Sequence, residues 1–61
     1  MTARLRKGDT LVWTQEGGPY KAGERKRALD VSPVDGLVCT WKQEGAFWTK
    51  VWTAQSNWRL R

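Results

Sequence analysis

The sequence predicts an all-β fold: a small SH3-like barrel of four to five short antiparallel strands, in a single domain over residues 1–61. Three observations predict it. Apolar and polar residues alternate with a period of two, and no segment carries an apolar stripe with the 3.6-residue helical period. Turns that contain glycine or proline separate the alternating segments. Closure into a barrel also removes the exposed edges of so small a sheet.

The first half of the chain contains one clear strand and one short strand. Residues 10–14 are rich in β-branched and aromatic residues, which favours a strand, and Gly17-Gly18-Pro19 ends it, because proline cannot donate to a ladder. The polar and basic stretch 20–27 is expected to be a long exposed loop. A short strand at 28–31 leads into a turn at 33–36, where Asp-Gly favours the left-handed backbone of a hairpin.

The second half contains the two longest strands. Residues 37–42 form the strongest predicted strand, and a turn at 43–45 leads into a second one at 46–53. The small polar residues 54–57 suit a tight turn before a last strand at 58–61. Residues 1–7 are expected to be a frayed basic terminus.

The alternation also predicts which side chains point inward. In the strand 37–42, Lys42 marks one face as solvated, so the opposite face is expected to face the core. In the last strand, the apolar residues alternate with arginines. The expected inward residues are Leu11, Trp13, Leu37, Cys39, Trp41, Trp58 and Leu60, and the expected outward residues are Arg59 and Arg61.

The strand 46–53 is ambiguous because each face holds both apolar and polar residues. If Phe47 and Val51 fill the core, then Trp48 and Trp52 flank Lys50 on an open surface, which would be a binding platform. If the two tryptophans fill the core, the outer face of this strand has no recognition role. The pattern alone leaves both registers open.

Composition excludes several kinds of chemistry. The chain has five tryptophans, one cysteine and no histidine, so it cannot form an internal disulfide or the usual zinc sites, and no metal or cofactor is expected. Cys39 is expected to be a small buried apolar residue in a reducing compartment. Without a positioned base we expect no enzymatic activity. The alternative is an active site at the shared pore of an oligomer, which one sequence cannot reveal.

Charge points to a polyanionic partner. Eleven lysines and arginines against six acids give a net charge of +5, and such a balance favours nucleic acid by long-range attraction. Basic residues that follow an aromatic one on a loop are suited to phosphate contact, and an exposed ring beside them can stack on bases. The predicted binding residues are Lys21, Arg25, Lys26, Arg27, Arg4, Arg6 and Lys7, with Tyr20 and Trp48 as the aromatic surface.

Two alternatives to nucleic-acid binding stay open. The basic loop can be a solvated charge run that only keeps the protein soluble. An exposed tryptophan patch can also bind a protein partner or a second copy of the chain, because tryptophan and arginine are favoured interface anchors.

The same sequence predicts a cytoplasmic location without membrane association. No apolar stretch approaches the roughly 20 residues that span a bilayer, and no hydrophobic segment follows the basic N-terminus as it does in a secretory signal.

Several short motifs resemble the YodC-like family of small bacterial proteins. The resemblance runs through Gly8-Asp9-x-Leu11, Gly17-Gly18-Pro19, Val38-Cys39-Thr40-Trp41, and a later aromatic residue with a closing apolar one. It covers most of the chain and is interrupted by the basic insertion at 20–27. The resemblance implies an SH3-like barrel, and it implies core positions for Trp52 and Trp58. The family supplies no activity to transfer.

Overall fold

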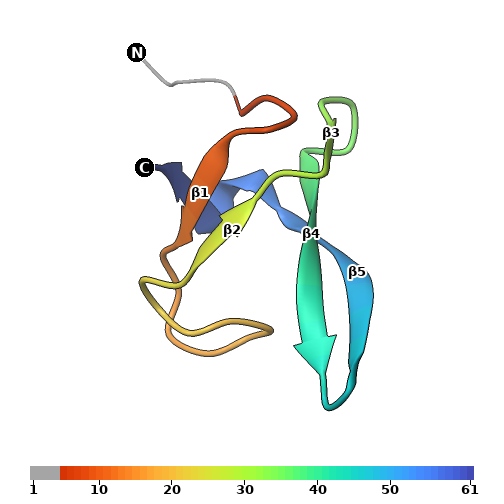
Figure 1. Ribbon diagram of the computed structural model, residues 1–61. Helices are drawn as coiled ribbons and strands as arrows, with labels where there is room; N and C mark the ends of the chain where they lie inside the picture. Colours follow the sequence, from red (N-terminus) through yellow and green to blue (C-terminus); the bar gives the residue numbers. More distant parts are fainter. Residues whose placement is uncertain (1–4) are drawn as a thin grey trace.

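Six short strands form within residues 5–61, which are the part of the chain that this computed structural model describes (Figure 1), and the two longest strands contain several β-branched and aromatic residues. They make two three-stranded antiparallel sheets, ordered β2-β1-β6 and β3-β4-β5. No helix in this range is long and apolar enough to cross a bilayer. The bounds are β1 Thr10–Trp13, β2 Arg25–Arg27, β3 Asp30–Ser32, β4 Leu37–Glu44, β5 Phe47–Ala54 and β6 Trp58–Leu60, with a 3₁₀ turn at Gln55–Asn57.

The core is built around three aromatic side chains. Trp13, Tyr20 and Trp58 pack against one another with ring centroids 4.9–5.6 Å apart, at the edge-to-face and tilted angles that aromatic quadrupoles favour. Each polar atom of these rings has a partner, since the Trp13 indole N–H donates to the Gly17 carbonyl and the Trp58 indole N–H donates to Thr53 Oγ1. Three large rings thus supply apolar area that a chain of this length otherwise lacks.

Most predicted strands are present, and the predicted all-β class is confirmed. The strands expected at 10–14, 37–42, 46–53 and 58–61 correspond to β1, β4, β5 and β6. The strand expected at 28–31 is shifted, because β3 spans Asp30–Ser32. The turn expected at 54–57 is a single 3₁₀ turn. The first four residues of the expected frayed terminus lie outside the described residues.

The expectation of a loop over the whole of 20–27 is wrong at its end. Arg25–Arg27 form β2, which pairs antiparallel with β1, with Leu11 opposite Lys26. The ladder continues past the strand, because the Trp13 amide donates to the Glu24 carbonyl. An all-basic strand has no apolar alternation to reveal it, but β2 is an edge strand of its sheet, where charged side chains are common.

The inward face of β4 is the reverse of the one expected. Val38 and Thr40 are completely buried and face the core, whereas Trp41 is 40% exposed on the outer face. The prediction was wrong because it assumed that the face of β4 with Lys42 is solvated, whereas Lys42 shares this face with the two buried residues Val38 and Thr40. Thr40 can be buried because its hydroxyl shares a hydrogen bond with the Tyr20 hydroxyl, which satisfies its polar group.

Cys39 is buried, as expected, although its side chain lies on the outer face of β4. Its register neighbours on that face are Asp30 of β3 and Trp52 of β5.

The register of β5 shows which face of this strand points inward, although Phe47 does not fill the core as the corresponding alternative expected, because it lies at the hairpin end and is 75% exposed. Thr40 lies opposite Val51 and Trp41 lies opposite Lys50, and directly opposite residues of an antiparallel pair share a face. Val51 therefore faces inward, and the tryptophans of β5 face outward. The core position that the resemblance implied for Trp52 is wrong, because Trp52 is 48% exposed, whereas Trp58 is buried as implied.

Candidate functional site

Four arginines lie on the outer face of the β2-β1-β6 sheet. Arg25 and Arg59 both lie opposite Val12, one on each side of β1. Arg27 lies opposite Thr10, and the Arg61 amide donates to the Thr10 carbonyl, which continues the β6 pairing by one residue. The four side chains therefore form two rows across one surface. We call this surface the arginine face, and its residues are Arg25, Arg27, Arg59 and Arg61.

The arginine face is exposed and carries no compensating acid. All four arginines are exposed, and β1, β2 and β6 contain no aspartate or glutamate. The ion pairs within residues 5–61 are Lys26–Glu24 and Lys42–Glu44, so they involve none of the four. Val12 is buried on this face even though it lies outside the core cluster. Arg25 and Arg59 flank Val12 on both sides, and an arginine can pack its methylene stem on such a neighbour while its charged end stays in water.

The predicted basic residues do not lie on one surface. Arg25 and Arg27 belong to the arginine face, whereas Lys26 points to the opposite side of β2. There its ammonium group lies 3.4 Å from a Glu24 carboxylate oxygen. Lys21 is exposed in the preceding loop. Arg6 and Lys7 are exposed near the N-terminus, and Arg4 lies outside the described residues.

Tyr20 is not the surface aromatic that the sequence predicted. Its ring is only 4% exposed, because it packs between Trp13 and Trp58. Its hydroxyl also donates to the Trp41 carbonyl. Burial raises the pKa of Tyr20 above its ordinary value, although the hydrogen bond to Thr40 opposes this shift. Tyr20 is therefore a neutral structural residue and is not available for stacking on a ligand.

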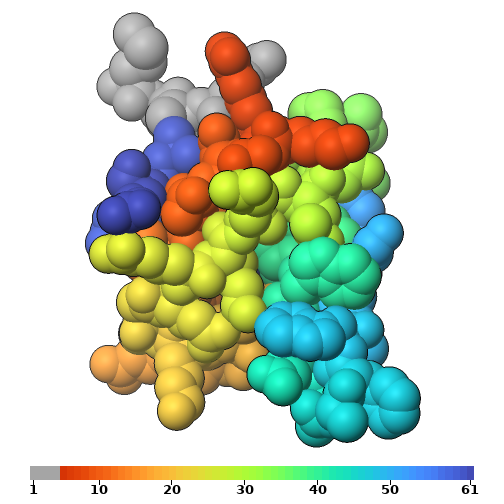
Figure 2. All heavy atoms as spheres, viewed as in Figure 1, coloured from red at the N-terminus to blue at the C-terminus, as the bar shows by residue number. Residues whose placement is uncertain are grey.

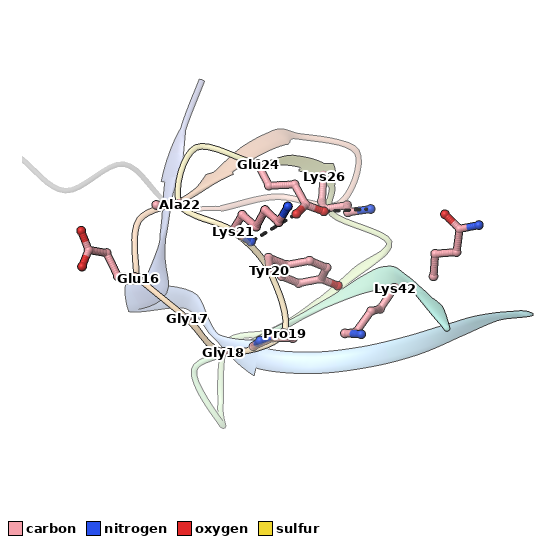
Figure 3. Close-up of a pocket in the computed structure, with 11 residues that line it drawn as sticks. Glu16, Gly17, Gly18, Pro19, Tyr20, Lys21, Ala22, Glu24, Lys26 and Lys42 are labelled. Atoms are coloured by element: carbon pink, nitrogen blue, oxygen red, sulfur yellow. Dashed lines mark hydrogen bonds and ion pairs between the residues drawn. The ribbon is translucent and has the colours of Figure 1, made fainter. Parts of the chain in front are cut away.

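An open cavity of about 640 Å³ lies over the edge of the Tyr20 ring (Figure 3). Figure 3 shows Glu24 and Lys26 on one side of this ring and Lys42 on the other. Two of the lysines that line the cavity are already paired with acids. Lys26 is paired with Glu24, and Lys42 Nζ lies 3.1 Å from Glu44 Oε1. Because opposite charges alternate around it, this cavity is a weaker candidate for binding an anion than the arginine face is.

The outer face of the β4–β5 hairpin carries the exposed tryptophans. Trp41 is 40%, Trp48 55% and Trp52 48% exposed, and register places them on one side of the hairpin together with Lys50. Trp48 is thus exposed, as in one of the two registers that the sequence left open. We call this surface the tryptophan face, and its residues are Trp41, Trp48, Lys50 and Trp52.

Two ammonium groups lie against the rings of the tryptophan face. Lys50 Nζ is 5.5 Å from the centroid of the Trp41 ring, and Lys26 Nζ is 5.3 Å from that of Trp48. Both distances lie within the range of a cation–π interaction. In Figure 2 the yellow-green side chains of β2 lie between the blue C-terminus and the teal and light-blue side chains of the hairpin. β2 therefore adjoins both surfaces.

Cys39 offers no nucleophilic chemistry here. Burial raises the pKa of its thiol, although the charge of Lys50 opposes the shift. The thiol therefore stays protonated at neutral pH, and the thiolate is the reactive form. Within residues 5–61 no three metal-ligating side chains gather in one place.

Sequence reasoning missed part of both surfaces. It predicted that Arg59 and Arg61 point outward, but their meeting with Arg25 and Arg27 depends on which strands flank β1. It also assigned Trp41 to the core. The alternation itself was the available signal, since the tryptophans and lysine of β5 fall on one face in either register.

Comparison with protein-family models, with curated proteins and with solved structures gives no match to this chain. The resemblance to the YodC-like family therefore stays a prediction.

Proposed function

We propose that this chain is a non-enzymatic nucleic-acid-binding module that holds the phosphate backbone on its arginine face. The observation that carries the proposal is the placement of four exposed arginines on one side of a three-stranded sheet without an acid in its strands. Each guanidinium can bind a phosphate through two parallel N–H donors, which a lysine cannot do.

The dimensions of the arginine face support contact with several phosphates at once. Strands lie about 4.8 Å apart and residues two apart along a strand are separated by roughly 7 Å. The four arginines therefore start from the corners of an area of about 10 by 7 Å, and their long side chains extend beyond it. The face offers no asparagine or glutamine to distinguish base edges, so binding is expected to depend little on base sequence.

The test is a fluorescence anisotropy titration of labelled oligonucleotides between 25 and about 200 mM salt. Four phosphate contacts give a slope of log K against log salt of about −3 on single strands and about −3.6 on duplex DNA. The variant R25Q/R59Q keeps part of each methylene stem beside Val12 but removes two phosphate contacts, and it should reduce the single-strand slope by about 1.4.

The matched control is K21Q/K42Q, which removes two charges from the cavity beside Tyr20. Its slope should stay near that of the unchanged protein. Absence of binding at 25 mM salt would refute the function. An equal loss in both variants would show that net charge, and not the arginine face, provides the affinity.

We also propose that the two sheets form an SH3-like barrel in a protein that works in the cytoplasm. The support for the barrel is the passage of the chain from β2 to β3 across Ala28 and Leu29, because small orthogonal sheets are joined by strands that bend from one sheet into the other. The buried residues come from both sheets, as a shared core requires: Leu11 and Trp58 from one, Val38 from the other.

A further inference from the structure

We propose that the Trp41–Trp48 end of the tryptophan face stacks on unpaired bases, which makes the preferred ligand a single-stranded nucleic acid. This inference rests on the proposed function, because it assigns the bases to a second surface of the same binding module. The starting observation is that the fold buries Trp13 and Trp58 but leaves three other indoles 40–55% exposed. Large exposed apolar patches on small proteins mark interaction sites.

The two tryptophans of this end are spaced to hold a planar group. Trp41 lies opposite Lys50 and Trp48 lies opposite Gln43, so the two tryptophans are diagonal neighbours on the sheet, about 7–8 Å apart. That separation is about twice the 3.4 Å rise per nucleotide of a strand. Trp41 and Trp48 line a shared hollow of about 430 Å³. A single base can therefore insert between the rings or stack on either of them.

Charge distinguishes the two ends of the tryptophan face. At the Trp41–Trp48 end each ring has an ammonium group within 5.5 Å of its centroid. Lys26, at Trp48, is paired with Glu24, whereas Lys50, at Trp41, takes part in neither ion pair of residues 5–61, and the register rows of the two rings contain no acid. At the other end, Asp35 lines a hollow with Trp52, and Asp30 lies in the same register row as Trp52, on the far side of Cys39. A phosphate beside a stacked base is attracted to the first end and repelled from the second.

The same charges disfavour a second copy of the chain as the occupant. A two-fold contact between tryptophan faces would bring the Lys50 side chains of both copies into one interface, and each chain carries a net charge of +5. A nucleic acid strand supplies the opposite charge together with planar rings. Bases within a duplex present only their edges in the grooves, so stacking on Trp41 or Trp48 requires unpaired bases.

The experiment compares three labelled probes of equal length: a thymidine strand, the same strand with abasic sites, and a duplex. The thymidine strand should bind at least about tenfold more tightly than the abasic strand. Trp41→Ala and Trp48→Ala should each weaken binding of the thymidine strand by about five- to hundredfold, because stacking of one base accounts for such a factor. Both variants should bind the abasic strand and the duplex as before.

Trp52→Ala is the matched control, because it removes an equally exposed indole from the acidic end. Its affinity for the thymidine strand should change by less than about twofold. Near-UV circular dichroism checks that every variant is folded.

The outcomes separate this inference from the proposed function. Equal affinity for the thymidine and abasic strands, unchanged in both variants but dependent on salt, overturns base stacking and leaves the arginine face intact. Loss of a dimer in Trp48→Ala, seen by sedimentation without a preference for single strands, assigns the tryptophan face to self-association and overturns base stacking. Absence of salt-dependent binding to all three probes refutes both proposals.

Discussion

The two sheets share one core but differ in the chemistry of their outer faces. The β2-β1-β6 sheet turns its tryptophans, Trp13 and Trp58, inward and covers its outside with arginines. The β3-β4-β5 sheet does the opposite, because it contributes Val38 and Thr40 to the interior and leaves its tryptophans outside. The same residue type therefore stabilises the fold in one sheet and is available for recognition in the other.

The cause of this difference is register. An indole on the inward face of β1 or β6 meets Tyr20 and gains aromatic packing. An indole one position out of phase, such as Trp52 beside inward-facing Val51, meets solvent. Whether a tryptophan of this chain is buried thus depends on which face of its strand carries it, since the residue type is the same in every case.

Removing one tryptophan from each sheet should give the largest difference in the free energy of unfolding. Trp58→Ala deletes a buried ring that packs 4.9 Å from Trp13, and it should cost about 3–5 kcal/mol. A domain of this size has roughly 3–9 kcal/mol of total stability, so the variant should lose about a third of that stability or more. Trp52→Ala should cost about 1 kcal/mol, the usual effect of a point substitution. Urea denaturation followed by circular dichroism measures both, and similar losses would refute the division of roles.

The next largest expected effect is the loss of the hydrogen bonds that the Tyr20 hydroxyl forms with β4. Tyr20→Phe removes the bond to the Trp41 carbonyl and leaves the buried Thr40 hydroxyl unpaired, which should cost about 1–3 kcal/mol. Replacing Thr40 by Val in the same chain should recover part of this loss, because no buried polar group then lacks a partner. An additive loss in the double variant would contradict this explanation. Denaturant titration of the three variants makes the comparison.

The same residue makes stability depend on alkaline pH. Burial raises the pKa of Tyr20 above 10.0 in the folded state, so the folded chain holds this proton more tightly than the unfolded chain does. The contribution is therefore constant below about pH 10 and falls as the pH rises further. The free energy of unfolding of Tyr20→Phe should decline less steeply above pH 10 than that of the unchanged protein. Parallel slopes would show that Tyr20 does not contribute.

The smallest expected effect is the difference in stability between two glycine substitutions in the loop beside Trp13. Gly18 has φ +86°, and a Cβ there would lie 3.1 Å from Trp13 Cζ2. Gly17 has φ +93° with no atom near its Cβ position, so it is the matched control. Gly17→Ala should cost about 1–2 kcal/mol from backbone strain alone, and Gly18→Ala should cost about that plus a few tenths. Thermal unfolding measures the difference, and equal costs would show that the indole moves aside freely.

Much of the fold could be predicted because strands and turns leave local patterns. The alternation in Trp58-Arg59-Leu60-Arg61 correctly placed each side chain inward or outward. β2 was missed because three consecutive basic residues contain no alternation, and the strand exists only through its pairing with β1.

The candidate surfaces were harder to predict, because they depend on contacts between distant segments. Thr40 can be buried only because Tyr20, twenty residues earlier, supplies its hydrogen-bond partner. Thr40 and the completely buried Val38 share the inward face of β4, so Trp41 lies on the outer face. The arginine face likewise requires that β1 have β2 on one edge and β6 on the other, and no local pattern specifies this order.

The position of Lys26 has a consequence for how the two surfaces move relative to each other. Its ammonium group lies near the buried Tyr20 ring and also near Trp48, out on the hairpin. The hairpin is therefore attached to the other sheet at a point far from β3, and bending it away would give up this attraction, which is worth about 0.5–1 kcal/mol for an accessible pair. A base that displaced Lys26 from Trp48 would loosen the hairpin, whereas a base that left the ammonium in place would rigidify it.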